Sequence, residues 1–142
     1  MRKAFAALAV LLTIVVIAEF FFAASGGFSS ASKHEAAYRL HHALGYVTFL
    51  LPVAMAIVAA SARLPRRLIW MSVLVVGLTS VQVAIAKLAI AIRDSGVGQL
   101  VSGLHAVNGL VMLAVVVMIV HRARAVAAEW RQTDNPQTSK MI

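Results

Sequence analysis

A histidine followed four residues later by a glycine occurs twice in this chain, as His41-x-x-x-Gly45 and His105-x-x-x-Gly109. Each copy lies about one turn inside the start of a long apolar segment, the second and the fourth of four. An ionisable side chain within a membrane is costly and marks a functional site. Two histidines at matching positions therefore predict two ligands of one cofactor, and haem is the flat, apolar cofactor that binds opposed imidazoles.

The composition is that of a membrane protein. The chain has 142 residues, of which 61% are hydrophobic and 13% charged, and its mean hydropathy is +0.89. Soluble domains have about 45–50% apolar and about 25% charged residues. There is no cysteine, which excludes disulfides, iron–sulfur clusters, thiolate metal sites and covalently attached c-type haem.

Four apolar spans are expected, each close to the roughly 20 residues that a bilayer requires. They cover Ala4–Ala24, Leu40–Ala62, Leu68–Ile92 and Leu100–Val120. The short connections between them predict an all-α, up-down-up-down four-helix bundle. Residues 1–125 would form this transmembrane domain, and residues 126–142 would form a polar tail that is helical to about Trp130.

The basic residues lie mainly on one side of the predicted spans, although the net charge of +8 belongs to the whole chain. One side has Arg2, Lys3, Arg63, Arg66, Arg67, Arg122, Arg124, Arg131 and Lys140, and the other has Lys33, Arg39 and Arg93. By the positive-inside rule, both termini and the tail are expected in the cytoplasm of a bacterial cell, with the spans in its plasma membrane. The basic residues then set topology, and no nucleic-acid partner is expected.

The first span ends in Ala23-Ala24-Ser25-Gly26, which is similar to a signal-peptide cleavage site. Its apolar stretch is longer than the roughly 7–15 residues of a signal peptide. We therefore expect this span to be retained as a transmembrane helix.

The two halves of the chain resemble each other. Leu40-His41 followed by Gly45-Tyr46-Val47 aligns with Leu104-His105 followed by Gly109-Leu110-Val111. Two copies of a helical hairpin related by an axis along the membrane normal place equivalent residues at equal depth. The repeat thus predicts that His41 and His105 face each other.

The ionisable residues within the spans share one layer. Glu19, His41, Lys87 and His105 are all expected within roughly 10 Å of the external boundary. Glu19 and Lys87 either form a buried ion pair or provide a proton or quinol site beside the cofactor. His42 is an alternate ligand to His41, because adjacent helical residues point about 100° apart and one of them faces the interior; the repeat favours His41.

Other residues near this layer are assigned supporting roles. Gly45 and Gly109 would leave room for the porphyrin edge or for close approach of helices. Arg39, Arg93 and Lys87 would pair with the haem propionates, and Tyr46 and Asn108 would donate hydrogen bonds around the histidines. No catalytic residue is identified.

The stretches His41-His42-Ala43-Leu44-Gly45-Tyr46 and Leu104-His105-Ala106-Val107-Asn108-Gly109-Leu110 resemble the ligand helices of small four-helix membrane b-type cytochromes. They are also similar to one half of the haem A synthase family, in which two alternate helices each supply a histidine to one haem. Over about residues 1–125, the chain resembles a family of small uncharacterised actinobacterial four-helix membrane proteins. The resemblance implies His41 and His105 as haem ligands. The chain has one four-helix unit where haem A synthase has two, and it does not match the catalytic glutamate motif, so synthase activity is not implied.

Two functions follow from these patterns. The first is a b-type cytochrome with one haem b near the external face, which transfers electrons or senses redox state with a quinol or an external partner. The alternative is a non-enzymatic accessory or structural subunit of a membrane complex or homo-oligomer, with a transition-metal site. Copper is an alternative to haem, because imidazole binds copper as well as haem iron. The other alternative is that the protein has no cofactor.

Overall fold

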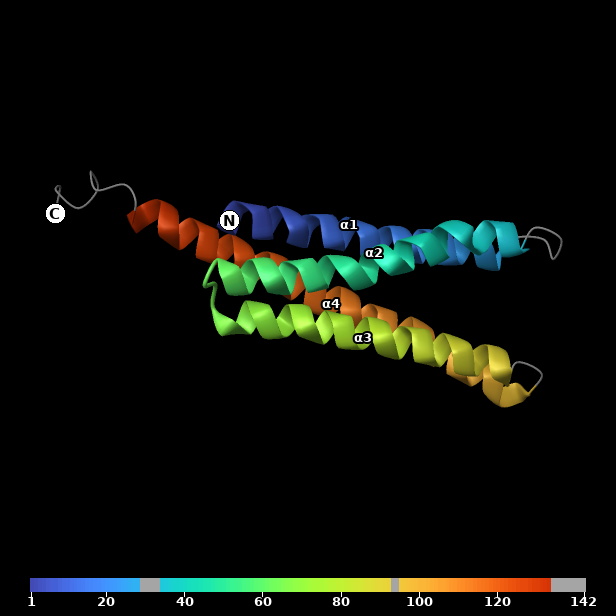
Figure 1. The fold of residues 1–142 in the computed structure, drawn as a ribbon. Helices are drawn as coiled ribbons and strands as arrows, with labels where there is room; N and C mark the ends of the chain where they lie inside the picture. The colour runs from blue at the N-terminus through green and yellow to red at the C-terminus, as the bar shows by residue number, and fades with distance from the viewer. Residues whose placement is uncertain (29–33, 93–94, 134–142) are drawn as a thin grey trace.

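The computed structural model of the chain is an all-α bundle of four helices, and it describes residues 1–28, 34–92 and 95–133 (Figure 1). The helices are α1 (Arg2–Gly27), α2 (His34–Ser61), α3 (Arg66–Ala91) and α4 (Gly96–Thr133), and they alternate in direction. Each is long and apolar enough to cross a membrane. A helix satisfies its backbone polar groups internally, which spanning a bilayer requires. The protein is a multi-pass membrane protein.

Helices α2 and α4 extend furthest beyond the predicted spans. α2 begins at His34 instead of near Leu40, and α4 runs from Gly96 to Thr133. Residues 126–133 of the predicted tail therefore continue α4, because alanine, arginine and glutamate in this stretch favour a helix. The last turns of α4 project past the other helices (Figure 1). The rest of the tail, residues 134–142, lies outside the described residues.

The helices pack in the order of the chain, and α4 also packs against α1. α2 and α4 therefore occupy diagonal positions, with α1 and α3 between them. The two hairpins, α1–α2 and α3–α4, are close together near the chain termini and diverge toward the other end (Figure 1). We call the half nearest the termini the terminal half, and the half where α1 and α3 end the distal half.

The hydrophobic core lies in the terminal half. The largest fully buried side chains, at less than 2% relative exposure, include Phe5, Leu12, Met55, Leu68 and Ile119. The cluster to which they belong continues only as far as Val16 on α1 and Val75 on α3. The buried side chains of the distal half are instead polar, among them Glu19 and Thr48. Apolar packing thus fixes the hairpins at one end, and polar contacts position them at the other.

Hydroxyl groups within the spans are mostly satisfied by their own helix. Thr13, Ser72 and Thr79 each donate to the carbonyl oxygen four residues earlier, at 2.9 Å. This contact removes the cost of placing a hydroxyl in an apolar environment. Thr48 is different, because its Oγ1 donates to Glu19 Oε1 on α1, at 3.5 Å.

The turn between α2 and α3 contains a backbone conformation that favours glycine. Arg63 has a φ of 50°. The Leu64 amide donates to the Ala59 carbonyl at 2.9 Å, and the Arg63 amide donates to the Ala60 carbonyl at 3.1 Å. These two bonds close α2 with a Schellman motif, whose left-handed position is usually glycine.

Replacing Arg63 with glycine is expected to stabilise the protein by about 0.5 kcal/mol. The left-handed conformation costs a residue with a side chain about 1–2 kcal/mol, and the greater chain entropy of glycine offsets about 0.5–1 kcal/mol of that gain. Arg63→Ala is the matched control, since it removes the same charge but keeps a Cβ. Thermal unfolding in detergent, followed by circular dichroism, should rank Arg63→Gly above Arg63→Ala; the reverse order would show that the turn is not strained.

Candidate functional site

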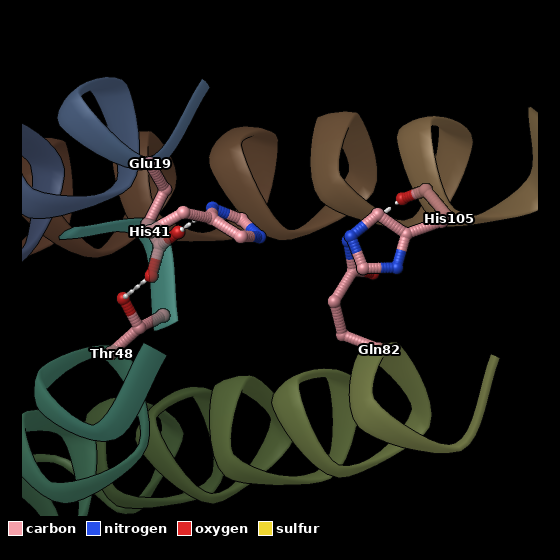
Figure 2. Close-up of polar contacts among 5 residues, drawn as sticks. All are labelled: Glu19, His41, Thr48, Gln82 and His105. Carbon is pink, nitrogen blue, oxygen red and sulfur yellow. Dashed lines mark hydrogen bonds and ion pairs between the residues drawn. The ribbon is translucent and has the colours of Figure 1, made fainter. Parts of the chain in front are cut away.

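Two histidine rings face each other inside the distal half (Figure 2). His41 lies on α2 and His105 on α4, the diagonal helices, and both side chains are partly buried. Their ring centroids are 6.4 Å apart, and the ring planes make an angle of 65°. The structure therefore brings together the two histidines that the internal repeat singles out.

Glu19 of α1 holds one side of the His41 ring. Its side chain is buried, and its Oε2 forms an ion pair with Nδ1 of His41, while its Oε1 accepts the hydrogen bond of Thr48 (Figure 2). A carboxylate beside Nδ1 favours a proton on that nitrogen, and when the imidazole is neutral its free electron pair is then on Nε2. In Figure 2 the second ring nitrogen of His41 points toward His105. The arrangement prepares His41 to bind a ligand on the interior side.

His105 is held through its backbone. Gln82 of α3 donates from Nε2 to the His105 carbonyl oxygen, at 2.8 Å (Figure 2). Asn108 donates from Nδ2 to the Leu78 carbonyl, at 3.0 Å, and also to Oε1 of Gln82. These amide contacts tie α3 to α4 beside the histidine, as interhelical hydrogen bonds do in membranes.

The His105 ring itself has an unsatisfied polar atom. Its Nδ1 is buried and has no hydrogen-bond partner within the part of the chain that the structure describes. A buried nitrogen without a partner costs free energy. A ligand or a bound water at Nδ1 would remove this cost.

The adjacent histidine, His42, does not face the interior. Its side chain is exposed, and its ring stacks on Tyr38 with the centroids 6.1 Å apart. The Tyr38 ring also lies 6.0 Å from that of His41. The Tyr38 ring packs against Gly26 of α1, because a Cβ on Gly26 would lie 2.9 Å from the ring.

The two glycines of the repeat have different surroundings. A Cβ on Gly109 would lie 3.0 Å from Phe20 Cζ and 3.6 Å from Gln82 Nε2, so this glycine allows Phe20 of α1 to pack against α4. A Cβ on Gly45 would lie 3.6 Å from Glu19 Oε1, which is an ordinary contact. Close helix packing explains Gly109, and Gly45 has room for a methyl group.

The remaining candidates are not gathered at the histidine pair. The side chains of Arg39 and Lys87 are exposed, and that of Tyr46 is 74% exposed on the outside of α2. Glu19 is paired with His41, and Lys87 takes no part in that contact. Arg93 lies outside the described residues.

Sequence reasoning missed four residues that surround the pair, namely Thr48, Gln82, Tyr38 and Phe20. Thr48 and Gln82 carry neutral polar groups within apolar spans. A survey of every polar residue by depth, instead of ionisable residues alone, would have placed both just below the layer of Glu19 and His105, at about 12 and about 15 Å from the expected external boundary. Nothing in the sequence marks Phe20 or Tyr38 as neighbours of the site.

The donor set limits which metal group the site could hold. No three or more His, Cys, Asp or Glu side chains are grouped to hold a metal ion in residues 1–28, 34–92 and 95–133. A bare zinc ion is bound by three or four protein ligands. Two imidazoles suffice where a macrocycle supplies the other donors, as in a haem with two axial histidines.

Alanine at the two repeat glycines should give opposite results. Gly45→Ala is expected to stabilise α2 by up to about 1 kcal/mol, the usual difference between the residues in a helix. At Gly109 the added methyl group pushes against Phe20, and overpacking of this kind costs about 1–3 kcal/mol. Unfolding of the two variants in detergent measures the difference, and equal stabilities would show that Phe20 does not pack on Gly109 in the membrane protein.

Comparison with known proteins identifies a family. Residues 19–90, about half of the chain, match the family described as "Family of unknown function (DUF6220)". The matched stretch contains Glu19, His41, Thr48 and Gln82 and ends before His105. No curated protein and no solved structure matches the chain. The chain therefore belongs to the DUF6220 family, which is described as a family of unknown function.

Proposed function

We propose that this protein is a membrane b-type cytochrome that binds one haem between His41 and His105. The observation that carries the proposal is the pair of interior imidazoles from diagonal helices, with ring centroids 6.4 Å apart. Two imidazoles that bind one metal ion from opposite sides have ring centres about 6 Å apart, because each metal–nitrogen bond takes about 2 Å and each ring adds about 1 Å. The observed separation is compatible with that arrangement.

The local contacts also support haem. Glu19 at His41 Nδ1 is the carboxylate–histidine pair that commonly orients metal-binding imidazoles. The hairpins diverge in the distal half, and the close-packed apolar core ends before it. The fully buried apolar side chains therefore do not extend between the two rings, although the partly buried Phe20 packs against the cluster from this layer.

The orientation in the membrane follows from charge. Arg63, Arg66, Arg67, Arg122 and Arg124 lie in the terminal half, so this end is cytoplasmic by the positive-inside rule. The histidine pair is then near the external face. Arg39 and Lys87 are exposed there, and they are the residues that would pair with propionates; the same role for Arg93 stays a prediction.

When bound, haem supplies reversible one-electron chemistry, for electron transfer or redox sensing with a quinol or an external protein. The chain's own residues orient and shield it. Glu19 holds the proton on His41 Nδ1, and Gln82 fixes the backbone position of His105. Phe20 of α1 packs against α4 at Gly109, where its ring would shield the haem from one side. A proton or quinol site at Glu19 and Lys87 stays a prediction.

A reduced-minus-oxidised spectrum of the purified protein tests the proposal directly. Protein from cells supplied with haem should show a low-spin haem b band, and His41→Ala and His105→Ala should each abolish it. His42→Ala is the matched control and should keep the full band, because His42 faces outward. Helicity by circular dichroism confirms that each variant is folded. A colourless wild-type protein would overturn the proposal and favour the accessory subunit, and a band retained in the double variant would overturn the choice of ligands.

The role of Glu19 has its own test. Glu19→Gln keeps the size and removes the charge at His41 Nδ1, and loss of such an orienting partner typically lowers affinity for the metal group by about 10–100-fold. The midpoint potential should rise, because a negative charge near the iron favours its oxidised form. Thr48→Val, which removes only the contact to the other carboxylate oxygen, should change both quantities much less. Wild-type affinity and potential in Glu19→Gln would assign Glu19 a purely structural role, with the ligand assignment unaffected.

A further inference from the structure

A second site lies in the terminal half, in a groove of about 380 Å³ between α3 and α4. The groove is lined by Arg67, Trp70, Met71, Leu74, Val115, Met118 and Arg122. Its floor is apolar, and its two charged residues are both arginines near the terminal end of the bundle. The histidine pair lies in the other half of the molecule, so the two sites are separate.

The positive charge of Arg67 at the groove is not reduced by an acidic residue in the first turn of its helix. Arg67 is in the first turn of α3, which has no acidic residue and no side-chain cap. The positive end of the helix dipole therefore adds to the charge of Arg67. Arg122 comes from the facing helix, and both arginine side chains are exposed. Two guanidinium groups beside a helix N-terminus favour a phosphate.

The rest of the groove favours a hydrocarbon chain. Met71, Leu74, Val115 and Met118 line it with apolar groups. Trp70 is 68% exposed at the same groove. Indole rings prefer the level where head groups meet acyl chains.

We propose that this groove binds one anionic phospholipid of the leaflet at the terminal end. Its phosphate lies between Arg67 and Arg122, and one acyl chain lies along the apolar floor. Basic pockets between transmembrane helices are a known way to bind anionic lipid head groups on the cytoplasmic side. The charge of the groove mouth selects an anionic lipid over a zwitterionic one, and its apolar floor selects a lipid over free phosphate.

Native mass spectrometry of the full chain in detergent, titrated with phosphatidylglycerol or phosphatidylcholine, tests the proposal. The wild-type protein should retain one phosphatidylglycerol and much less phosphatidylcholine. Arg67→Gln with Arg122→Gln should weaken the binding of phosphatidylglycerol by roughly thirtyfold, since each basic residue near a lipid head group contributes about 1 kcal/mol. Arg66→Gln with Arg124→Gln is the matched control, because it removes the same charge from the same end but outside the groove lining.

Two further experiments distinguish lipid binding in the groove from lipid binding to a diffuse basic surface. Met118→Trp fills the floor without changing the charge, and it should also weaken retention of the lipid. Excess glycerol phosphate, which has the head-group anion without acyl chains, should not displace the lipid. Any one of four results would overturn the proposal. The two double arginine variants could lose phosphatidylglycerol binding equally, or Met118→Trp could bind it like the wild type. Glycerol phosphate could displace the lipid, or the wild type could retain phosphatidylcholine as well as phosphatidylglycerol. Circular dichroism shows that each variant is folded.

Discussion

A carboxylate buried between two membrane helices is the constraint on which the distal half depends. Glu19 is 9% exposed, and a charge in an apolar interior is very costly without a partner. His41 Nδ1 and Thr48 supply that partner from α2. Because the cost of breaking such a pair is large, it fixes the register of α1 against α2 and the direction of the His41 ring together. The geometry of the interior imidazole follows from the need to satisfy Glu19.

The two halves of the bundle are stabilised by different forces. In the terminal half, side chains such as Phe5, Leu12 and Ile119 pack closely, and lipid competes little with such shape-specific contacts. In the distal half, the fully buried large apolar side chains are replaced by a layer of carboxylate, imidazole and amide groups. A close-packed end keeps the hairpins together while the other end stays divergent.

The sequence predicted the fold and the histidine pair because both depend on local or repeated patterns. Span length and apolar composition determined the four helices, and the repeat placed His41 and His105 at one depth. The partner of Glu19 was not predictable in the same way, because depth along a helix says nothing about direction around it. Lys87 shares the depth of Glu19 but is exposed on α3, whereas His41 is on the adjacent α2. Gln82 was missed because a neutral amide was not counted among the costly residues.

The internal repeat makes the histidines equivalent in position, yet the structure makes them different in chemistry. His41 has an anion beside its ring, whereas His105 is held through its backbone by the neutral amide of Gln82. An anion at Nδ1 increases the basicity of the opposite nitrogen. In the proposed haem site His41 would therefore be the stronger donor of the two, and the haem would be bound unequally. The similar stretches of sequence around His41 and His105 make the pair alike in position, and single residues on α1 and α3, Glu19 and Gln82, make their surroundings different.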